Sequence, residues 1–177
     1  MNYLALIRGI NVGGNSLLKM DSLKAAFEAA GFKGVRTYIQ SGNVFFSSDN
    51  LDQLALAEQI SKLIAEHFHI SAGVVVFTEQ QWREIIQSAP IWWGKDQSWK
   101  HNLLILLPPY DMAEVVEAVG VLKPAIEAMA PGDGVLYQSM SLELFGRTTT
   151  GKLASNPVYK RMTVRNYNTA NKLLQLF

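Results

Sequence analysis

The stretch VRTYIQSGNVFFSS, residues 35–48, decides the predicted fold. Its two halves, VRTYIQ and NVFFSS, are rich in β-branched and aromatic residues, a composition typical of strands. Ser41 and Gly42 join the halves, and a glycine-containing pair between two such runs is typical of a tight hairpin turn. The stretch therefore predicts two adjacent antiparallel strands.

Helical patterns flank this hairpin on both sides. Before it, MDSLKAAFEAAG places apolar residues on one helical face and ends at Gly31, a favourable stop position for glycine. After it, residues 51–68 repeat apolar residues at helical spacing behind Asn50, which predicts the N-cap. YLALIR before the first helix and GVVVFT after the second predict two further strands. The order over residues 1–78 is β-α-β-β-α-β, which predicts a ferredoxin-like unit.

The second half of the chain repeats this order incompletely. Residues 79–100 predict a helix, opened by a capping box of Thr78 and Gln81, and then a Trp-rich connector. Residues 101–177 predict a second α+β unit with a strand at HNLLILL, helices at DMAEVVEAV and LKPAIEAMA, a hairpin of GVLYQSM and LELFG, and a basic C-terminal helix capped by Thr163. The second half reads β-α-β-β-α, and the strand that should be its sixth element is not evident. The predicted fold class is α/β (α+β), a tandem of two ferredoxin-like β-α-β-β-α-β units of which the second is imperfect.

Charge is distributed unevenly along the chain. Residues 1–143 carry ten Lys/Arg and all fifteen Asp/Glu, a balance of −5, whereas residues 144–177 carry six Lys/Arg and no acid, a balance of +6. Such a basic end is typical of an anion-binding surface. The alternative is a face that packs on the acidic remainder and neutralises it.

Composition excludes several classes of protein. The chain has no cysteine, so it forms no disulfide and no thiolate site, in agreement with a reducing, cytoplasmic setting. The N-terminus lacks the basic region of a signal peptide. LLILLPP, the densest apolar run, is far shorter than the roughly 20 residues needed to span a bilayer, so no membrane anchor is expected.

The predicted fold brings the first glycine-rich loop, RGINVGGN, beside the hairpin turn. In a β-α-β-β-α-β sheet the first two strands run in the same direction, so the loops that follow them lie at the same end. This edge would bring together hydrogen-bond donors without any acidic side chain. Its residues are Arg8, Asn11, Gly13, Gly14, Lys19, Gln40, Ser41, Gly42 and Asn43. Backbone N–H groups beside Arg and Lys suit an anion. The alternative is a tight connection whose polar residues satisfy their own backbone.

Three motifs, R-G-I-N-V-G-G, Y-I-Q-S-G-N-V and T-V-R-N-Y-N-T, carry a resemblance to a known family. Together with the neighbouring helices they closely resemble the bacterial domain-of-unknown-function family numbered sixteen ninety-seven, from residue 3 almost to the end of the chain. The resemblance implies a tandem of two ferredoxin-like α/β units. It implies no reaction, because none is established for the family. Tyr167 stands where relatives often carry another aromatic residue.

The stretch FGRTTTGKL, residues 145–153, has the G-x-x-x-x-G-K spacing of a phosphate loop. Leu153 stands where that loop needs a Ser or Thr hydroxyl to hold Mg²⁺, and the preceding LELF predicts a hairpin arm rather than a parallel strand. The sequence therefore argues against a nucleotide-hydrolysing loop. Arg147 and Lys152 remain candidate donors to an anion, and Arg165 and Asn166 near the start of the last helix add further donors.

Other chemistries find little support in the residue pattern. His67, His69 and His101 do not have a metal-ligand spacing, and no base stands near Ser41 in the sequence. The tryptophans of the connector fit either stacking on a ring or anchoring between the two halves. An RNA-recognition function would rest on analogy of fold alone, because NVFFSS lacks the required motif.

The sequence thus predicts a cytoplasmic protein that binds an anionic ligand, a nucleotide or nucleic acid, at a basic, glycine-rich edge. The residues of the first unit would form one side, and Arg147, Lys152, Arg165 and Asn166 the other if the two halves face each other. An enzyme acting on a phosphorylated small molecule without a protein nucleophile is one alternative. A structural or oligomerising module is the other. No metal and no cofactor are predicted, and whether the protein is an enzyme and its oligomeric state stay open.

Overall fold

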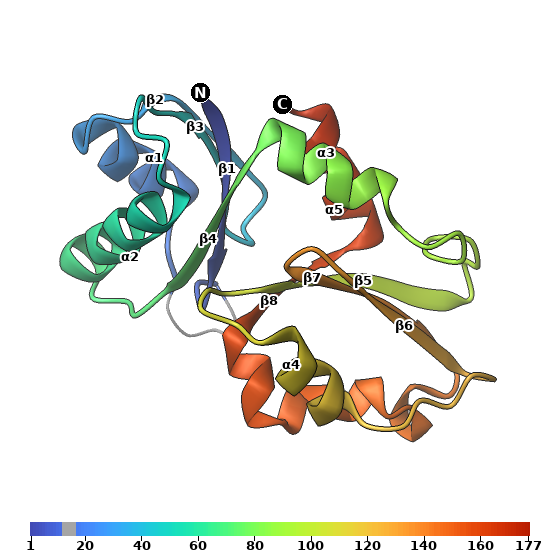
Figure 1. Cartoon of the computed structure of the whole chain (residues 1–177). Coiled ribbons are helices and arrows are strands. Elements are labelled where there is room, and N and C mark those ends of the chain that lie inside the picture. The colour runs from blue at the N-terminus through green and yellow to red at the C-terminus, as the bar shows by residue number, and fades with distance from the viewer. Residues whose placement is uncertain (12–16) are drawn as a thin grey trace. The chain divides into compact units, whose positions relative to one another are not determined.

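The computed structural model describes residues 1–11 and 17–177 (Figure 1). They form two compact units, residues 1–82 with Phe177 and residues 83–176. The division falls inside helix α3 (Glu79–Gln87). None of the helices in the described ranges is long and apolar enough to cross a membrane.

The first unit is a four-stranded antiparallel sheet with two helices on one face (Figure 1). Its elements are β1 (Asn2–Arg8), α1 (Met20–Ala29), β2 (Lys33–Tyr38), β3 (Asn43–Ser47), α2 (Gln53–Phe68) and β4 (Gly73–Thr78). The strand order is β2-β3-β1-β4, and β1 pairs antiparallel with both β3 and β4. This is the ferredoxin-like arrangement that the sequence predicted.

The core of the first unit follows from the period of its strands and helices. Alternate residues of β1, Tyr3, Ala5 and Ile7, are buried in the same apolar cluster as residues of α1 and α2 such as Phe27 and Ile60. α2 begins later than predicted, because Asp52 rather than Asn50 caps it. The Asp52 carboxylate accepts hydrogen bonds from the second and third backbone N–H groups beyond it, at 3.0 and 3.1 Å.

Gly42 fixes the hairpin turn against β1. Its φ is +74°, and a Cβ atom there would lie 2.9 Å from Ile7 Cβ and 3.0 Å from Ile10 Cδ1. The Ile7 N–H donates to the Gly42 carbonyl at 2.8 Å. Only glycine combines this backbone conformation with so close an approach, so the turn residue that suggested the hairpin also sets its position on the sheet.

The second unit has the same strand order as the first, but different helices pack on its sheet. Its strands are β5 (Trp99–Leu106), β6 (Glu127–Gly132), β7 (Val135–Ser141) and β8 (Met162–Asn166). Its helices are α4 (Met112–Val119) and α5 (Tyr167–Gln175), with short 3₁₀ helices η1 (Phe145–Arg147), η2 (Thr150–Ser155) and η3 (Pro157–Arg161). All strand pairs are antiparallel and the order is β6-β7-β5-β8, the counterpart of the first sheet. The fold is thus a tandem of two ferredoxin-like units, and the second is imperfect because 3₁₀ turns stand in place of its second helix.

Two strands of the second unit lie where the sequence predicted helix. β6 occupies the end of LKPAIEAMA, and its hairpin with β7 turns at Asp133 and Gly134, so the segment LELFG is not a strand. β8 occupies the start of the predicted C-terminal helix, and Thr163 pairs with Ile105 instead of capping a helix. Asn166 is the true N-cap of α5, accepting from the Thr169 N–H at 2.8 Å. In both places pairing with a neighbouring strand of the sheet outweighs local helix propensity.

The helix α4 and the 3₁₀ turns cover one face of the second sheet (Figure 1). Leu104, Leu136 and Met162 from three strands join the same apolar cluster as Val115 of α4 and Val158 of η3. The opposite face carries Leu103 and Arg165, which stand opposite each other in the β5–β8 register. Successive side chains of a strand point to opposite faces of the sheet, so neighbouring residues such as Leu103 and Leu104 lie on different faces.

Candidate ligand-binding site

The two loops of the predicted first-unit edge lie together, and the amide side chains of Asn11 and Asn43 are used within the unit. Asn11 Nδ2 donates to the Gln40 carbonyl at 2.9 Å and to the Leu18 carbonyl at 3.0 Å, and Asn11 Oδ1 accepts from the Leu18 N–H at 2.7 Å. Asn11 thereby joins the loop after β1 to the loop after β2, as the common direction of these strands predicted. Because the side chain is engaged by three backbone groups, its main role is structural.

Other predicted residues of that edge differ in accessibility. Asn43 is fully buried, and its Nδ2 donates to the Tyr38 carbonyl at 2.9 Å and to Ser41 Oγ at 3.0 Å. Lys19 and Gln40 are exposed, whereas Arg8 and Ser41 are half-buried and Gly42 is buried. Gly13 and Gly14 lie outside the described residues.

The donor-rich segment that resembles a phosphate loop already holds an anion of the protein itself. Glu127 is 1 % exposed, and its carboxylate accepts from the N–H groups of Thr149, at 2.9 Å, and Thr150, at 2.8 Å. The Thr150 hydroxyl and the Lys123 N–H donate to it as well, at 2.8 and 3.0 Å. Desolvation raises the pKa of Glu127, but these hydrogen bonds outweigh it and the pKa is lowered. The segment therefore binds a carboxylate of its own unit.

The predicted basic residues of the second unit do not share one site. Arg147 and Lys152 are exposed. Arg165 is 4 % exposed, its Nη1 donates to Thr163 Oγ1 and to the Val164 carbonyl, each at 2.9 Å, and burial lowers its pKa to about 10. The guanidinium of Arg165 is thus enclosed in protein. Asn166, the fourth predicted residue, is exposed and lines a pocket.

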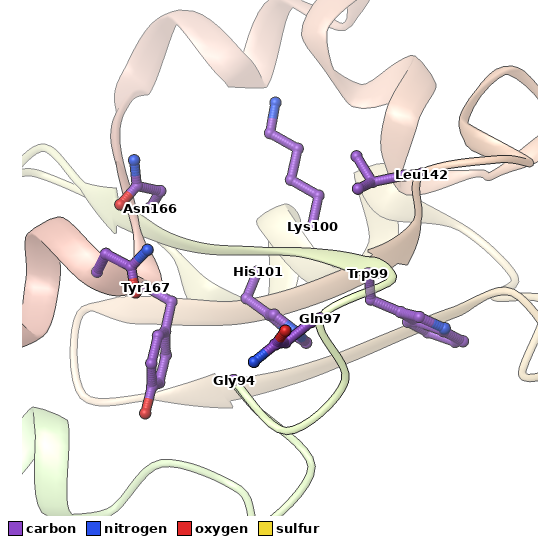
Figure 2. Close-up of a pocket in the computed structure, with 9 residues that line it drawn as sticks. Gly94, Gln97, Trp99, Lys100, His101, Leu142, Asn166 and Tyr167 are labelled. Carbon is purple, nitrogen blue, oxygen red and sulfur yellow. The ribbon is translucent and has the colours of Figure 1, made fainter.

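That pocket lies entirely in the second unit, where β5 begins and β8 passes into α5. Its volume is about 690 Å³. The residues that line it are Gly94, Gln97, Trp99, Lys100, His101, Leu142, Asn166, Tyr167 and Asn168. Figure 2 shows Lys100, Leu142 and Asn166 on one side of β5, and His101, Gln97 and Tyr167 on the other.

The pocket exists because the two neighbours of β5 differ in extent. β7 pairs with β5 along its whole length, Trp99 opposite Ser141, but β8 pairs with β5 only from Asn102 onward. Among the described residues, the first three of β5 therefore have no strand neighbour on the β8 side. The turn from β8 into α5 leaves the space open.

The electrostatics of the pocket favour an anion. Its lining includes Lys100 and His101 but no acidic side chain. In the described part of the chain the Lys100 ammonium forms no ion pair, and it lies 5.9 Å from the ring centroid of Phe145. The N-terminal end of α5, which carries a partial positive charge, opens beside Asn166. A negatively charged group would be stabilised there and would neutralise the cation.

His101 forms a fixed wall of this pocket. Its Nδ1 lies 2.6 Å from Ser139 Oγ and its Nε2 lies 2.7 Å from the Asp96 carbonyl oxygen. Ser139 is 2 % exposed and does not line the pocket, so it is not placed to attack a ligand there. Ser139 and the Asp96 carbonyl therefore orient the imidazole of His101, and Ser139 does not serve as a nucleophile.

An aromatic cluster packs beside His101, whose ring centroid lies 6.2 Å from that of Tyr167. The Trp93 and Tyr167 rings meet edge to face, with centroids 4.8 Å apart, and Trp93 Nε1 donates to the Asn102 carbonyl at 3.0 Å. The backbone of Gly94 lies directly against the Tyr167 ring, because a Cβ on Gly94 would lie 2.1 Å from Tyr167 Cε2. Trp93 thus anchors the connector within the second unit, and Trp99 lines the pocket.

Sequence reasoning found one residue of this pocket as a ligand donor, Asn166, and missed Lys100. The sequence pattern placed Lys100 at the end of the Trp-rich connector, and its place beside Asn166 depends on the β5–β8 register. Within the described ranges, no group of three or more His, Asp or Glu side chains is placed to hold a metal ion.

Fold and pocket together define a class: a protein of two ferredoxin-like units in tandem, the second of which carries an acid-free pocket. The chain belongs to the family described as "Protein of unknown function (DUF1697)", whose model matches residues 1–137. A solved structure described as that of the conserved bacterial protein SP0830 from Streptococcus pneumoniae is similar to it. The two share 28 % sequence identity and a TM-score of 0.87, over 99 % of this chain and 97 % of the other. No curated protein matches the chain.

Proposed function

We propose that the second unit binds a small anionic ligand, a nucleotide or another phosphorylated small molecule, in the pocket beside β5 and α5. The observation that carries this proposal is the acid-free lining, in which Lys100 and the start of α5 are placed around one open space. The volume of about 690 Å³ lies within the range of about 300–1,000 Å³ that is common for small-molecule sites.

The pocket supports binding rather than a named reaction. Both ring nitrogens of His101 are engaged by Ser139 and Asp96, so neither is directed at a ligand. Lys100 would hold a phosphate or carboxylate as a point charge, and Asn166 would offer its amide N–H. An enzyme that clamps a phosphorylated substrate with these groups is the second candidate, favoured if turnover accompanies binding. A cytoplasmic location stays a prediction that the cysteine-free composition supports.

Calorimetry with inorganic phosphate, ribose 5-phosphate and nucleoside monophosphates at low salt tests the proposal. We expect Lys100→Ala to weaken binding roughly 10- to 100-fold, the usual effect of losing a hydrogen bond to a charged group. Lys172→Ala is the matched control, since Lys172 is an exposed lysine in the last turn of α5. Equal binding by the wild type and Lys100→Ala would rule out the pocket as the site.

The predicted edge of the first unit is tested separately, with a single-stranded RNA. Nucleic-acid binding that falls steeply with salt, survives Lys100→Ala and is lost in Lys19→Ala would move the anion site to the first unit. Binding of small anions that requires Lys100 and is indifferent to Lys19 supports the pocket of the second unit instead.

A further inference from the structure

A second, smaller cavity lies on the sheet of the same unit, with a volume of about 80 Å³. Its floor includes Asn102 of β5 and Gln138 of β7, and its walls include Thr150 and Tyr159 from the 3₁₀ turns. Lys100 lines this cavity and the larger pocket alike. The two spaces therefore have one cation in common in their linings.

Asn102 and Gln138 form a cross-strand pair on the sheet face that lines this cavity. They stand directly opposite each other in the β5–β7 register, and Asn102 Nδ2 donates to Gln138 Oε1 at 2.9 Å. The exposed fraction is 7 % for Asn102 and 4 % for Gln138. The next pair along the two strands on this face is apolar, Leu104 opposite Leu136.

Each carboxamide keeps one group that is not used. Across residues 1–11 and 17–177, the hydrogen bond between the two is the only one that either side chain makes, so Asn102 Oδ1 and Gln138 Nε2 have no partner. No side-chain nitrogen or oxygen in the described part of the chain is both fully enclosed and unpartnered. These two atoms therefore border the cavity that both residues line.

The chemistry presented to the cavity does not depend on how the two amides are oriented. If both were turned over, the pair would still share one hydrogen bond and would present a free amide N–H from Asn102 and a free oxygen from Gln138. In either case one donor and one acceptor lie side by side. A buried donor and acceptor are unfavourable without partners, and the space holds a few waters at roughly 30 Å³ each or one small planar group.

We infer that the ligand carries a planar group with an adjacent donor and acceptor, the edge of a pyrimidine base, which binds Asn102 and Gln138. Its anionic group binds at Lys100 in the larger pocket. This inference rests on the proposed function and names its ligand class, a pyrimidine nucleotide. Asn166 stands opposite Asn102 in the β5–β8 register and lines the larger pocket, so one row across the sheet, Gln138, Asn102 and Asn166, runs from the lining of the smaller cavity to the lining of the larger pocket. The small volume favours a single six-membered ring over a purine.

Three probes on the wild-type protein test the inference by calorimetry: uridine 5′-monophosphate, its N3-methyl derivative and ribose 5-phosphate. We expect uridine 5′-monophosphate to bind at least tenfold more tightly than ribose 5-phosphate, because only the former offers a base edge. The N3-methyl group removes the donor of that edge, so the derivative should lose the tenfold gain. Equal affinity for uridine 5′-monophosphate and ribose 5-phosphate, or for the methylated and unmethylated nucleotides, would overturn the inference while leaving the anion site intact. Binding of none of the three would overturn the proposed function as well.

The double variant Asn102→Leu, Gln138→Met gives an independent readout. It replaces both amides by apolar side chains of similar shape, which is expected to leave the melting temperature without ligand unchanged or higher. The variant should keep the wild-type affinity for ribose 5-phosphate and lose the preference for uridine 5′-monophosphate. A preference that persists in the folded double variant contradicts a role for this pair.

Discussion

The carboxylate of Glu127 accepts hydrogen bonds from both the backbone N–H and the hydroxyl of Thr150, each at 2.8 Å. Glu127 belongs to β6 and Thr150 begins η2, so the contact joins the edge strand to the start of η2. A spacing that resembles a phosphate loop is thus explained by a structural need. The loop presents donors because a buried carboxylate requires them.

Glu127→Gln should destabilise the protein by about 1–3 kcal/mol in urea unfolding at pH 7, because an amide cannot accept from all the donors that face it. The effect should depend on pH. The pKa of Glu127 is lowered from the ordinary value of 4.5 in the folded state, so its contribution is present above that value and is lost as the pH falls through the folded pKa. Glu143→Gln is the control, an exposed glutamate of the same unit. Wild-type stability of the Glu127→Gln variant at pH 7 would contradict this account.

Gly94→Ala should cost about 2 kcal/mol or more. The residue has φ +83°, and the added methyl carbon would lie 2.1 Å from Cε2 of Tyr167, so the ring or the connector must move. Gly146→Ala should change stability by less than about 0.5 kcal/mol, since no atom lies within 4 Å of a Cβ there. Denaturant midpoints of the two variants, measured side by side, decide the point; equal midpoints would refute the close packing at Gly94.

Asn11→Ala should destabilise the first unit by about 2–3 kcal/mol, because three hydrogen bonds to backbone groups of Leu18 and Gln40 are lost and alanine is unfavourable at φ +55°. The backbone N–H of Leu18 donates to Asn11 Oδ1, so its proton should exchange faster with solvent in the variant. Gln40→Ala keeps its backbone carbonyl and should change neither quantity. Unchanged exchange at Leu18 in the Asn11→Ala variant would show that the link is not maintained in solution.

Tyr137→Phe should cost about 1–2 kcal/mol, because the Tyr137 hydroxyl donates to the Ile85 carbonyl at 2.5 Å and both groups are within one unit. Burial raises the pKa of Tyr137 above the ordinary 10.0. The stability linked to this shift is present below pH 10 and is lost as the pH rises through the folded pKa. The Tyr137→Phe variant should therefore lose less stability between about pH 9 and 11 than the wild type. Equal losses of stability in the variant and the wild type over this pH range would contradict the account.

Much of the first unit could be predicted because its signals are local. A glycine turn, two amphipathic helices and short β-rich runs follow each other without ambiguity. In the second unit, Glu127 and the alanines around it favour a helix by themselves, yet the segment is an edge strand because β7 lies beside it. β8 was missed for the same reason, since its partner β5 is about 60 residues earlier.

The candidate site could be predicted less well than the fold. Polar type and loop position singled out Asn11 and Asn43, but these side chains hold the loops together. Arg165 could not be recognised as buried without knowing that it lies on a strand. Asn102 and Gln138 each follow or precede other polar residues of their strands, so neither stands out in the sequence, and only the register places them opposite each other.

The 3₁₀ turns that replace a helix in the second unit give the two sheets different surfaces. In the first unit, α2 buries a row of large side chains on its sheet and leaves that face filled. In the second unit, η1, η2 and η3 occupy the equivalent connection, and a space remains that is lined by two amides, each with one unused group. Under the proposed function, the two units have different roles. The sheet face of the first unit is packed for folding stability, and part of the sheet face of the second unit is left open to bind a ligand.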